Sequence, residues 1–208
     1  MADYFGYGDY GYGGAVAVSS VDEGTVRSGG NTVLDVPVNE RFVVDWSHPN
    51  FLPVRAEGHA LPGEPFEHAI PLVEAVEIGS PLDQRFERSG WIDDGLGHIA
   101  VQVREGRASG GTPGDLLVGA SVSIDANAEV VAREKRDWAY GSAPGSTVAD
   151  GDVIFANVDL GTVTVTVELP PDGQETCGLS PGASAVPGFS HAVESVPDTV
   201  TSVVFVCW

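Results

Sequence analysis

The chain has few basic side chains and a single lysine. Ten Lys and Arg residues stand against thirty Asp and Glu residues, which leaves a net charge of −20, and the one lysine is Lys135. Proteins bind nucleic acid largely by neutralising its phosphates with basic side chains, so a strongly acidic chain is repelled by it. We therefore expect no nucleic-acid partner, and anionic membrane surfaces are disfavoured for the same reason.

Long apolar runs are also missing. No stretch approaches the roughly 18 apolar residues that a membrane-spanning helix needs, and the opening sequence MADYFGYGDYGYGG has neither the basic region nor the apolar region of a secretory signal peptide. We expect no membrane span, and a signal peptide is not visible in this sequence.

Cysteine is scarce, but its arrangement is informative. Cys177 and Cys207 are the only cysteines in a Gly-rich chain. An isolated pair of this kind favours a disulfide and an oxidising, extracellular or cell-surface location. Closing a loop of about 30 residues is worth roughly 3.7 kcal/mol in the chain-entropy model. Two free buried thiols remain the alternative, and a zinc site is disfavoured because two cysteines supply only half of a tetrahedral ligand set.

Motifs for catalysis and cofactor binding are missing as well. The sequence has no Gly-x-Ser-x-Gly elbow and no EF-hand loop. His59, Glu64 and His68 match no established metal-binding spacing. We expect no enzyme activity, no catalytic residues, no metal site and no cofactor. Weak calcium binding by the carboxylates of "WIDDG" and "ADGD" stays open.

Short apolar runs rich in Val, Thr, Ile and Phe are what the chain does contain, and Gly, Pro, Asn and Asp separate them. This pattern predicts strands joined by turns. The expected strands are 15–18, 32–36, 41–46, 52–56 and 70–78, then 98–105, 116–125, 129–141, 151–159, 161–169 and 198–208. The last run is apolar on both faces, so we expect it between covered surfaces or at an edge protected by another chain. Evenly spaced strands without helical patterns predict an all-β protein built from antiparallel sandwiches.

The composition suggests three regions. Residues 1–14 form a Tyr/Gly-rich N-terminal tail, residues 15–92 a first β-sandwich domain with its linker, and residues 93–208 a second β-sandwich domain. The first domain lacks a clear opening strand before Ala15, so we expect it to be incomplete unless the tail or a strand from another chain fills that place.

The second half has a pattern of glycine, aromatic and β-branched residues at fixed positions. These residues are Gly119, Ala120 and Val122, then Phe155, Asn157 and Val158, then Gly161, Thr162, Val165 and Val167. The pattern resembles that of the carboxypeptidase regulatory-like, or transthyretin-like, domain family. Pro49, Phe51 and Pro53 of the first half match its closing strands more loosely. The resemblance implies two tandem transthyretin-like, Ig-like sandwiches, of a kind that serves extracellular proteins as appendages or tandem modules without catalytic residues of their own.

The tail is the most suggestive feature for function. Its aromatic residues are Tyr4, Phe5, Tyr7, Tyr10 and Tyr12. Aromatic side chains supply large contact areas at low entropic cost, and an extended segment can add a strand to a neighbouring sheet. We therefore expect a non-catalytic structural protein that associates with itself or with other surface proteins, assembling into a filament or array through these residues. The alternative is a polysaccharide- or calcium-binding accessory module of a larger complex.

Overall fold

The computed structural model describes most of the chain. The described residues are 2–8, 14–18, 22–26, 31–36, 40–48, 51–59, 66–70, 95–106, 114–134, 137–141, 152–171, 176–180 and 188–208. Within these ranges the regular structure is entirely β, and no helix is long and apolar enough to cross a membrane. The prediction of an all-β protein is confirmed.

Counted over the described ranges, seven strands precede residue 93 and nine follow it. They are β1 (Ala2–Gly8), β2 (Gly14–Val18), β3 (Asp22–Val26), β4 (Asn31–Val36), β5 (Arg41–His48), β6 (Phe51–His59) and β7 (Phe66–Ile70), then β8 (Gly97–Glu105), β9 (Ser121–Ile124), β10 (Glu129–Glu134), β11 (Asp137–Gly141), β12 (Asp152–Val158), β13 (Gly161–Glu168), β14 (Cys177–Ser180), β15 (Ser190–Ser195) and β16 (Val200–Cys207).

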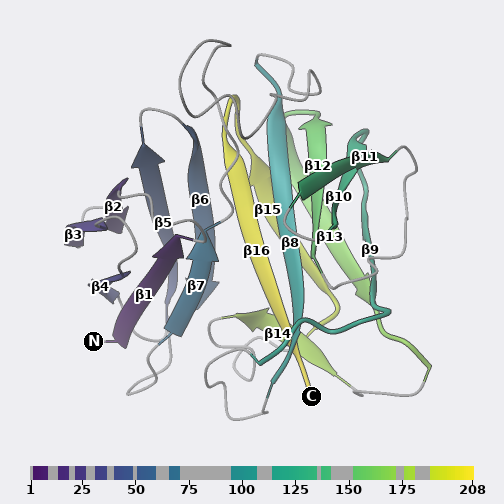
Figure 1. Cartoon of the computed structure of the whole chain (residues 1–208), viewed down its shortest axis with the longest axis horizontal. Helices are drawn as coiled ribbons and strands as arrows, with labels where there is room; N and C mark the ends of the chain where they lie inside the picture. The colour runs from purple at the N-terminus through teal and green to yellow at the C-terminus, as the bar shows by residue number, and fades with distance from the viewer. Residues whose placement is uncertain are drawn as a thin grey trace.

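These strands form three sheets (Figure 1). The largest has the order β11-β10-β12-β8-β16-β6-β5-β2-β3, and β14 also pairs with β16. A smaller sheet has the order β15-β13-β9, and a third has the order β4-β1-β7. The largest sheet therefore contains strands from both halves of the sequence.

Strand β16 lies at the centre of the largest sheet. It pairs in parallel with β8 along its whole length, from Val200 opposite His98 to Cys207 opposite Glu105. Its other edge pairs in parallel with β6 at residues 200–202 and antiparallel with β14 at residues 204–207. All eight of its residues are buried. The two-sided apolar run was thus correctly expected between covered surfaces, and no second chain is required to cover it.

The sandwich core lies between this central region and the β15-β13-β9 sheet, which Figure 1 shows behind β16 and β8. Alternate residues of β13, Val163, Val165 and Val167, point into this core, as do Val203 and Phe205 of β16. The Thr residues between the valines stay on the outer face. The alternation that the sequence shows over 161–168 therefore corresponds to one buried face and one solvated face.

The opposite face of the largest sheet is buried too. Phe42, Val44 and Trp46 of β5 share this face with Val54 and Ala56 of β6 through direct register pairs. Val200 and Ser202 of β16 continue the same face, because they lie opposite Val54 and Ala56. The half-buried strand predicted at 41–46 is confirmed, with Arg41 and Asp45 exposed on its other side.

Several expected elements differ in the structure. Residues 129–141 form two strands, β10 and β11, which pair antiparallel. The strand expected at 70–78 is described only as far as Ile70, and residues 71–94, with most of the predicted linker, lie outside the described residues. The tail contributes a regular strand, β1. The division into two tandem sandwiches stays a prediction, although the pairing of β16 with β6 joins strands from both sides of the expected boundary.

Candidate functional site

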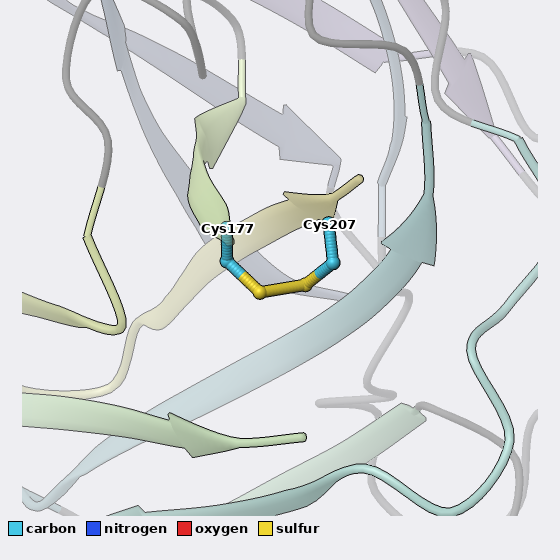
Figure 2. Close-up of a disulfide and its surroundings, with 2 residues drawn as sticks. All are labelled: Cys177 and Cys207. Atoms are coloured by element: carbon cyan, nitrogen blue, oxygen red, sulfur yellow. A yellow bond between two sulfur atoms is a disulfide. The ribbon is translucent and has the colours of Figure 1, made fainter. Parts of the chain in front are cut away.

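Cys177 and Cys207 form the predicted disulfide, with their Cα atoms 4.0 Å apart (Figure 2). They are direct register partners in β14 and β16. The adjacent pair exchanges two backbone hydrogen bonds: the Thr176 N–H donates to the Trp208 carbonyl at 3.2 Å, and the Trp208 N–H donates to the Thr176 carbonyl at 2.9 Å. The cysteines therefore occupy the neighbouring non-hydrogen-bonded position, where facing side chains approach most closely. Both are fully buried in the sandwich core.

Three of the five predicted assembly residues, Tyr4, Phe5 and Tyr7, lie in β1, the middle strand of its sheet. Their partners are Leu34, Val33 and Asn31 of β4, antiparallel, and Phe66, Glu67 and Ala69 of β7, parallel. Both edges of β1 are thus paired inside its own chain. Tyr10 and Tyr12 lie outside the described residues, and the role of all five in assembly stays a prediction.

A group of polar side chains lies between the outer edge of β15 and strands β6 and β5. Nε2 of His191 in β15 is 3.8 Å from Oε2 of Glu57 in β6. The His191 side chain is only 5% exposed, and the described atoms offer its Nε2 no hydrogen-bond partner. On the same face of the large sheet, Nε of Arg55 donates a 3.0 Å hydrogen bond to Oδ1 of Asp45 in β5. We call these four residues the junction group.

The hydrogen bond to Asp45 raises the pKa of the Arg55 guanidinium above its ordinary value, and the nearby charges of Asp45 and Glu57 act in the same direction. The Arg55 side chain is 35% exposed and that of Asp45 50% exposed, so solvent screens this ion pair. The junction group therefore forms a partly open, acidic surface beside the edge of β15.

At several positions that carry the family resemblance, the backbone conformation explains why that type of residue occurs there. Gly119 has φ +86° and Gly161 has φ +118°, values that favour glycine. Asn157 has φ +53° at a register irregularity between β12 and β8, and asparagine tolerates this conformation better than most residues. The Asn157 N–H donates to Nδ1 of the buried His98 at 3.3 Å. These positions are explained by local geometry alone, and membership of the family stays a prediction.

The carboxylates of Asp125, which follows β9, and Asp159, which follows β12, accept hydrogen bonds from neighbouring residues of the chain. Oδ1 of Asp125 accepts a 2.6 Å hydrogen bond from the Thr164 N–H, which lowers the pKa of this carboxyl. Oδ2 of Asp159 accepts a 2.9 Å hydrogen bond from the Asn127 amide. Across the described part of the chain, no group of three or more His, Cys, Asp or Glu residues is placed to hold a metal ion. His59 lies in β6 and His68 in β7, while Glu64 lies outside the described residues.

Only part of the junction group could have been found from the sequence. Asp45 and Arg55 are ten residues apart in a hairpin, and an alternation count over 41–59 could have paired them. His191 comes from a strand that the sequence pattern did not reveal, because Ser190–Ser195 contains only two apolar residues.

Comparison with known proteins places the chain in no family. No family model matches it, and no curated protein matches it in sequence. Among solved structures it is similar to the shaft pilin SpaA of Lactobacillus rhamnosus GG, with 9% identity, a TM-score of 0.30, and coverage of 100% of this chain and 97% of the pilin. It is also similar to GBS52, a minor pilin of Streptococcus agalactiae, with 7% identity, a TM-score of 0.31, and coverage of 100% and 95%. TM-scores this low do not establish a shared fold or function.

Proposed function

We propose that this chain is a non-catalytic, extracellular structural protein that assembles with further copies of itself by exchanging strand β1. The observation that carries the proposal is the place of Ala2–Gly8 in the middle of the β4-β1-β7 sheet. In the described structure β4 and β7 pair with β1 and not with each other. If β1 leaves, each of them therefore has an unpaired edge.

A second copy can fill this place with the same residues. The β1 strand of a neighbour would make the same main-chain hydrogen bonds and bring the same Tyr and Phe side chains. The exchanged contact is therefore equivalent in energy to the internal one, apart from the entropy of association. Strand addition of this kind obtains affinity from the main chain and specificity from alternate side chains.

Exchange between copies is a head-to-tail contact. Each copy donates one strand and accepts one, so the contact is heterologous, and it gives an open filament when the rotation between copies does not close a ring. The buried disulfide suits an oxidising extracellular location. The alternative of a polysaccharide- or calcium-binding module stays a prediction, and no described feature favours it.

Two variants, each with one cysteine added to the native Cys177–Cys207 bridge, test the exchange directly. Tyr4 and Leu34 are register partners, so Tyr4→Cys in one preparation and Leu34→Cys in another can be mixed and oxidised. A mixed disulfide joins the two variants when β1 of one copy lies beside β4 of the other. We expect covalent heterodimers on a non-reducing gel, and we expect light scattering to show that removal of residues 2–14 abolishes assembly.

The matched control replaces Leu34→Cys by Val33→Cys, because Val33 lies opposite Phe5, one position away and on the other face. Exchange with the native register gives far more cross-linking at position 34 than at position 33. Equal cross-linking at both positions, or assembly of the shortened chain as efficient as that of the intact one, would refute the exchange.

A further inference from the structure

The outer edge of β15 carries main-chain groups that point away from its own sheet. The Val167 N–H donates to the Phe189 carbonyl at 2.7 Å, so the backbone groups of residue 189 face β13. Successive residues of a strand direct these groups to opposite sides. The N–H and C=O of Ser190, Ala192 and Glu194 therefore point outward. A second hydrogen bond agrees with this assignment, since Oγ1 of Thr201 in β16 donates to the Glu194 carbonyl at 2.7 Å.

No described strand pairs with this outer edge, because β15 ends the β15-β13-β9 sheet. Ser190, Ala192 and Glu194 are exposed, whereas His191, Val193 and Ser195 are buried and fix the strand on the core. Neither lysine nor proline occurs in β15, although these residues often protect natural sheet edges from pairing.

The surface beside this edge is acidic. Strand β15 packs on β16 and β8, and the contact between His191 and Glu57 places β6 next to its outer edge. In the large sheet β6 follows β16, and β5 follows β6. A strand added to β15 would therefore lie over the junction group. That surface has the carboxylates of Asp45 and Glu57 and one guanidinium, Arg55, which is already bound to Asp45. Glu194 lies on the other face of β15, where its carboxylate accepts a 2.7 Å hydrogen bond from Oγ1 of Thr162 in β13.

We propose that the outer edge of β15 binds an extended, basic segment of a partner protein by strand addition. The main chain of the segment would pair with the outward groups of Ser190 and Ala192, and the Lys or Arg side chains on the face turned toward the large sheet would meet Glu57 and Asp45. Charge complementarity with Asp45 and Glu57 selects this occupant over the same edge of a second copy, which would bring the same carboxylates to the contact. This site is separate from β1 and does not depend on its exchange.

A labelled synthetic peptide in which lysine alternates with valine is the probe, and fluorescence anisotropy measures its binding to the intact chain. Because any polycation is attracted to this protein, the matched peptide has the same lysines but prolines in place of the valines and cannot form a strand. We expect the Lys/Val peptide to bind at least about tenfold more tightly than the Lys/Pro peptide, which corresponds to a few main-chain hydrogen bonds.

Substitutions at Ala192 separate main-chain pairing from charge. Ala192→Pro removes an outward N–H and leaves the groups that face β13, so we expect about tenfold weaker binding with the thermal midpoint nearly unchanged. Ala192→Ser keeps the N–H and should bind like the parent chain. Glu57→Gln should weaken binding several-fold at low salt and little at high salt.

A second measurement uses the parent protein and changes only the peptide, so it does not depend on whether a protein variant folds. Methylating the backbone nitrogens along one edge of the peptide should abolish tight binding, and methylating those along the other edge should leave it intact. The proposal is overturned if the Lys/Val and Lys/Pro peptides bind equally, if Ala192→Pro binds like the parent chain, or if methylation of either edge has the same effect. It is also overturned if light scattering shows the edge occupied by a second copy in a dimer that Ala192→Pro dissociates.

Discussion

Gly97, the first residue of β8, lies against residues 195 and 196 with no room for a side chain. A Cβ atom at this position would clash with Oγ of Ser195 and would lie 3.0 Å from the Val196 carbonyl oxygen. We predict that Gly97→Ala lowers the free energy of unfolding by about 1–3 kcal/mol, the usual cost of overpacking. Urea denaturation followed by circular dichroism measures this change in the free energy of unfolding.

The double variant Gly97→Ala with Ser195→Ala is the control, because it removes the hydroxyl that the new methyl group meets. Ser195 donates only a long hydrogen bond, 3.4 Å to the Val158 carbonyl, so its loss alone should cost little. If the double variant is no more stable than Gly97→Ala, the clash with Ser195 is not the source of the loss.

Asp125 gives the second prediction at this scale. Its folded pKa is lowered because the carboxylate accepts the Thr164 N–H, and the ordinary value is 3.8. Because the pKa of Asp125 is lower in the folded chain than in the unfolded chain, its ionised carboxylate stabilises the fold. This stabilisation is present above about pH 4 and is lost as the pH falls through the lower folded pKa. We expect Asp125→Ala to be less stable than the parent chain at neutral pH and equally stable near pH 1–2 in paired unfolding curves. A stability difference that does not change with pH would contradict this.

At the scale of the elements, four residue pairs and one disulfide join β14 to β16. We predict that replacing both Cys177 and Cys207 by Ala lowers the free energy of unfolding by about 3–4 kcal/mol, mostly by releasing the unfolded chain. Reduction of the parent chain should have a similar effect, and the double variant should be insensitive to reductant. A loss below about 1 kcal/mol would show that the bridge adds little to pairing and packing.

The sequence predicted some elements well and others not at all. Strands β13 and β16 were predicted from their sequence patterns. Gly161–Glu168 alternates because one face of β13 is buried, and Val200–Cys207 is apolar on both sides because both faces of β16 are buried. The strand β1 has no such pattern, since glycine alternates irregularly with aromatic and acidic residues. Its place depends on pairing with β4 and β7, which lie far away in the sequence.

The candidate sites were less predictable than the fold. A disulfide could be expected because only two cysteines are present. The junction group and the edge of β15 depend on which strands end a sheet and which lie beneath them. His191 and Glu57 are brought within 3.8 Å by this arrangement, and strand order is not contained in the local pattern of any one strand.

At the scale of the whole molecule, the net charge determines how thermal stability depends on salt concentration. With a net charge of −20, the excess acidic side chains repel one another more strongly in the compact state than in the unfolded chain. Raising ionic strength from about 0.1 M to about 1 M shortens the screening length from roughly 10 Å to roughly 3 Å. We predict that the thermal midpoint rises by several degrees over this range, measured by calorimetry in sodium chloride.

Potassium chloride is the matched control, because screening depends on ionic strength and not on the identity of the monovalent cation. The two salts should give the same rise. An unchanged midpoint in both salts would show that repulsion between the acidic side chains is already relieved. A rise at millimolar calcium would instead indicate the calcium binding that the sequence leaves open.

The central position of β16 also has a consequence for biosynthesis. Its residues follow, in the sequence, every strand with which they pair: β6, β8 and β14. Translation delivers these partners first, so until Val200–Cys207 emerges the middle of the largest sheet has a gap, and Cys177 has no partner cysteine. The nascent chain therefore cannot close its central sheet early. For an exported protein, such a delay would keep the central sheet open, and the polypeptide able to pass through a secretion channel, until Val200–Cys207 has been made.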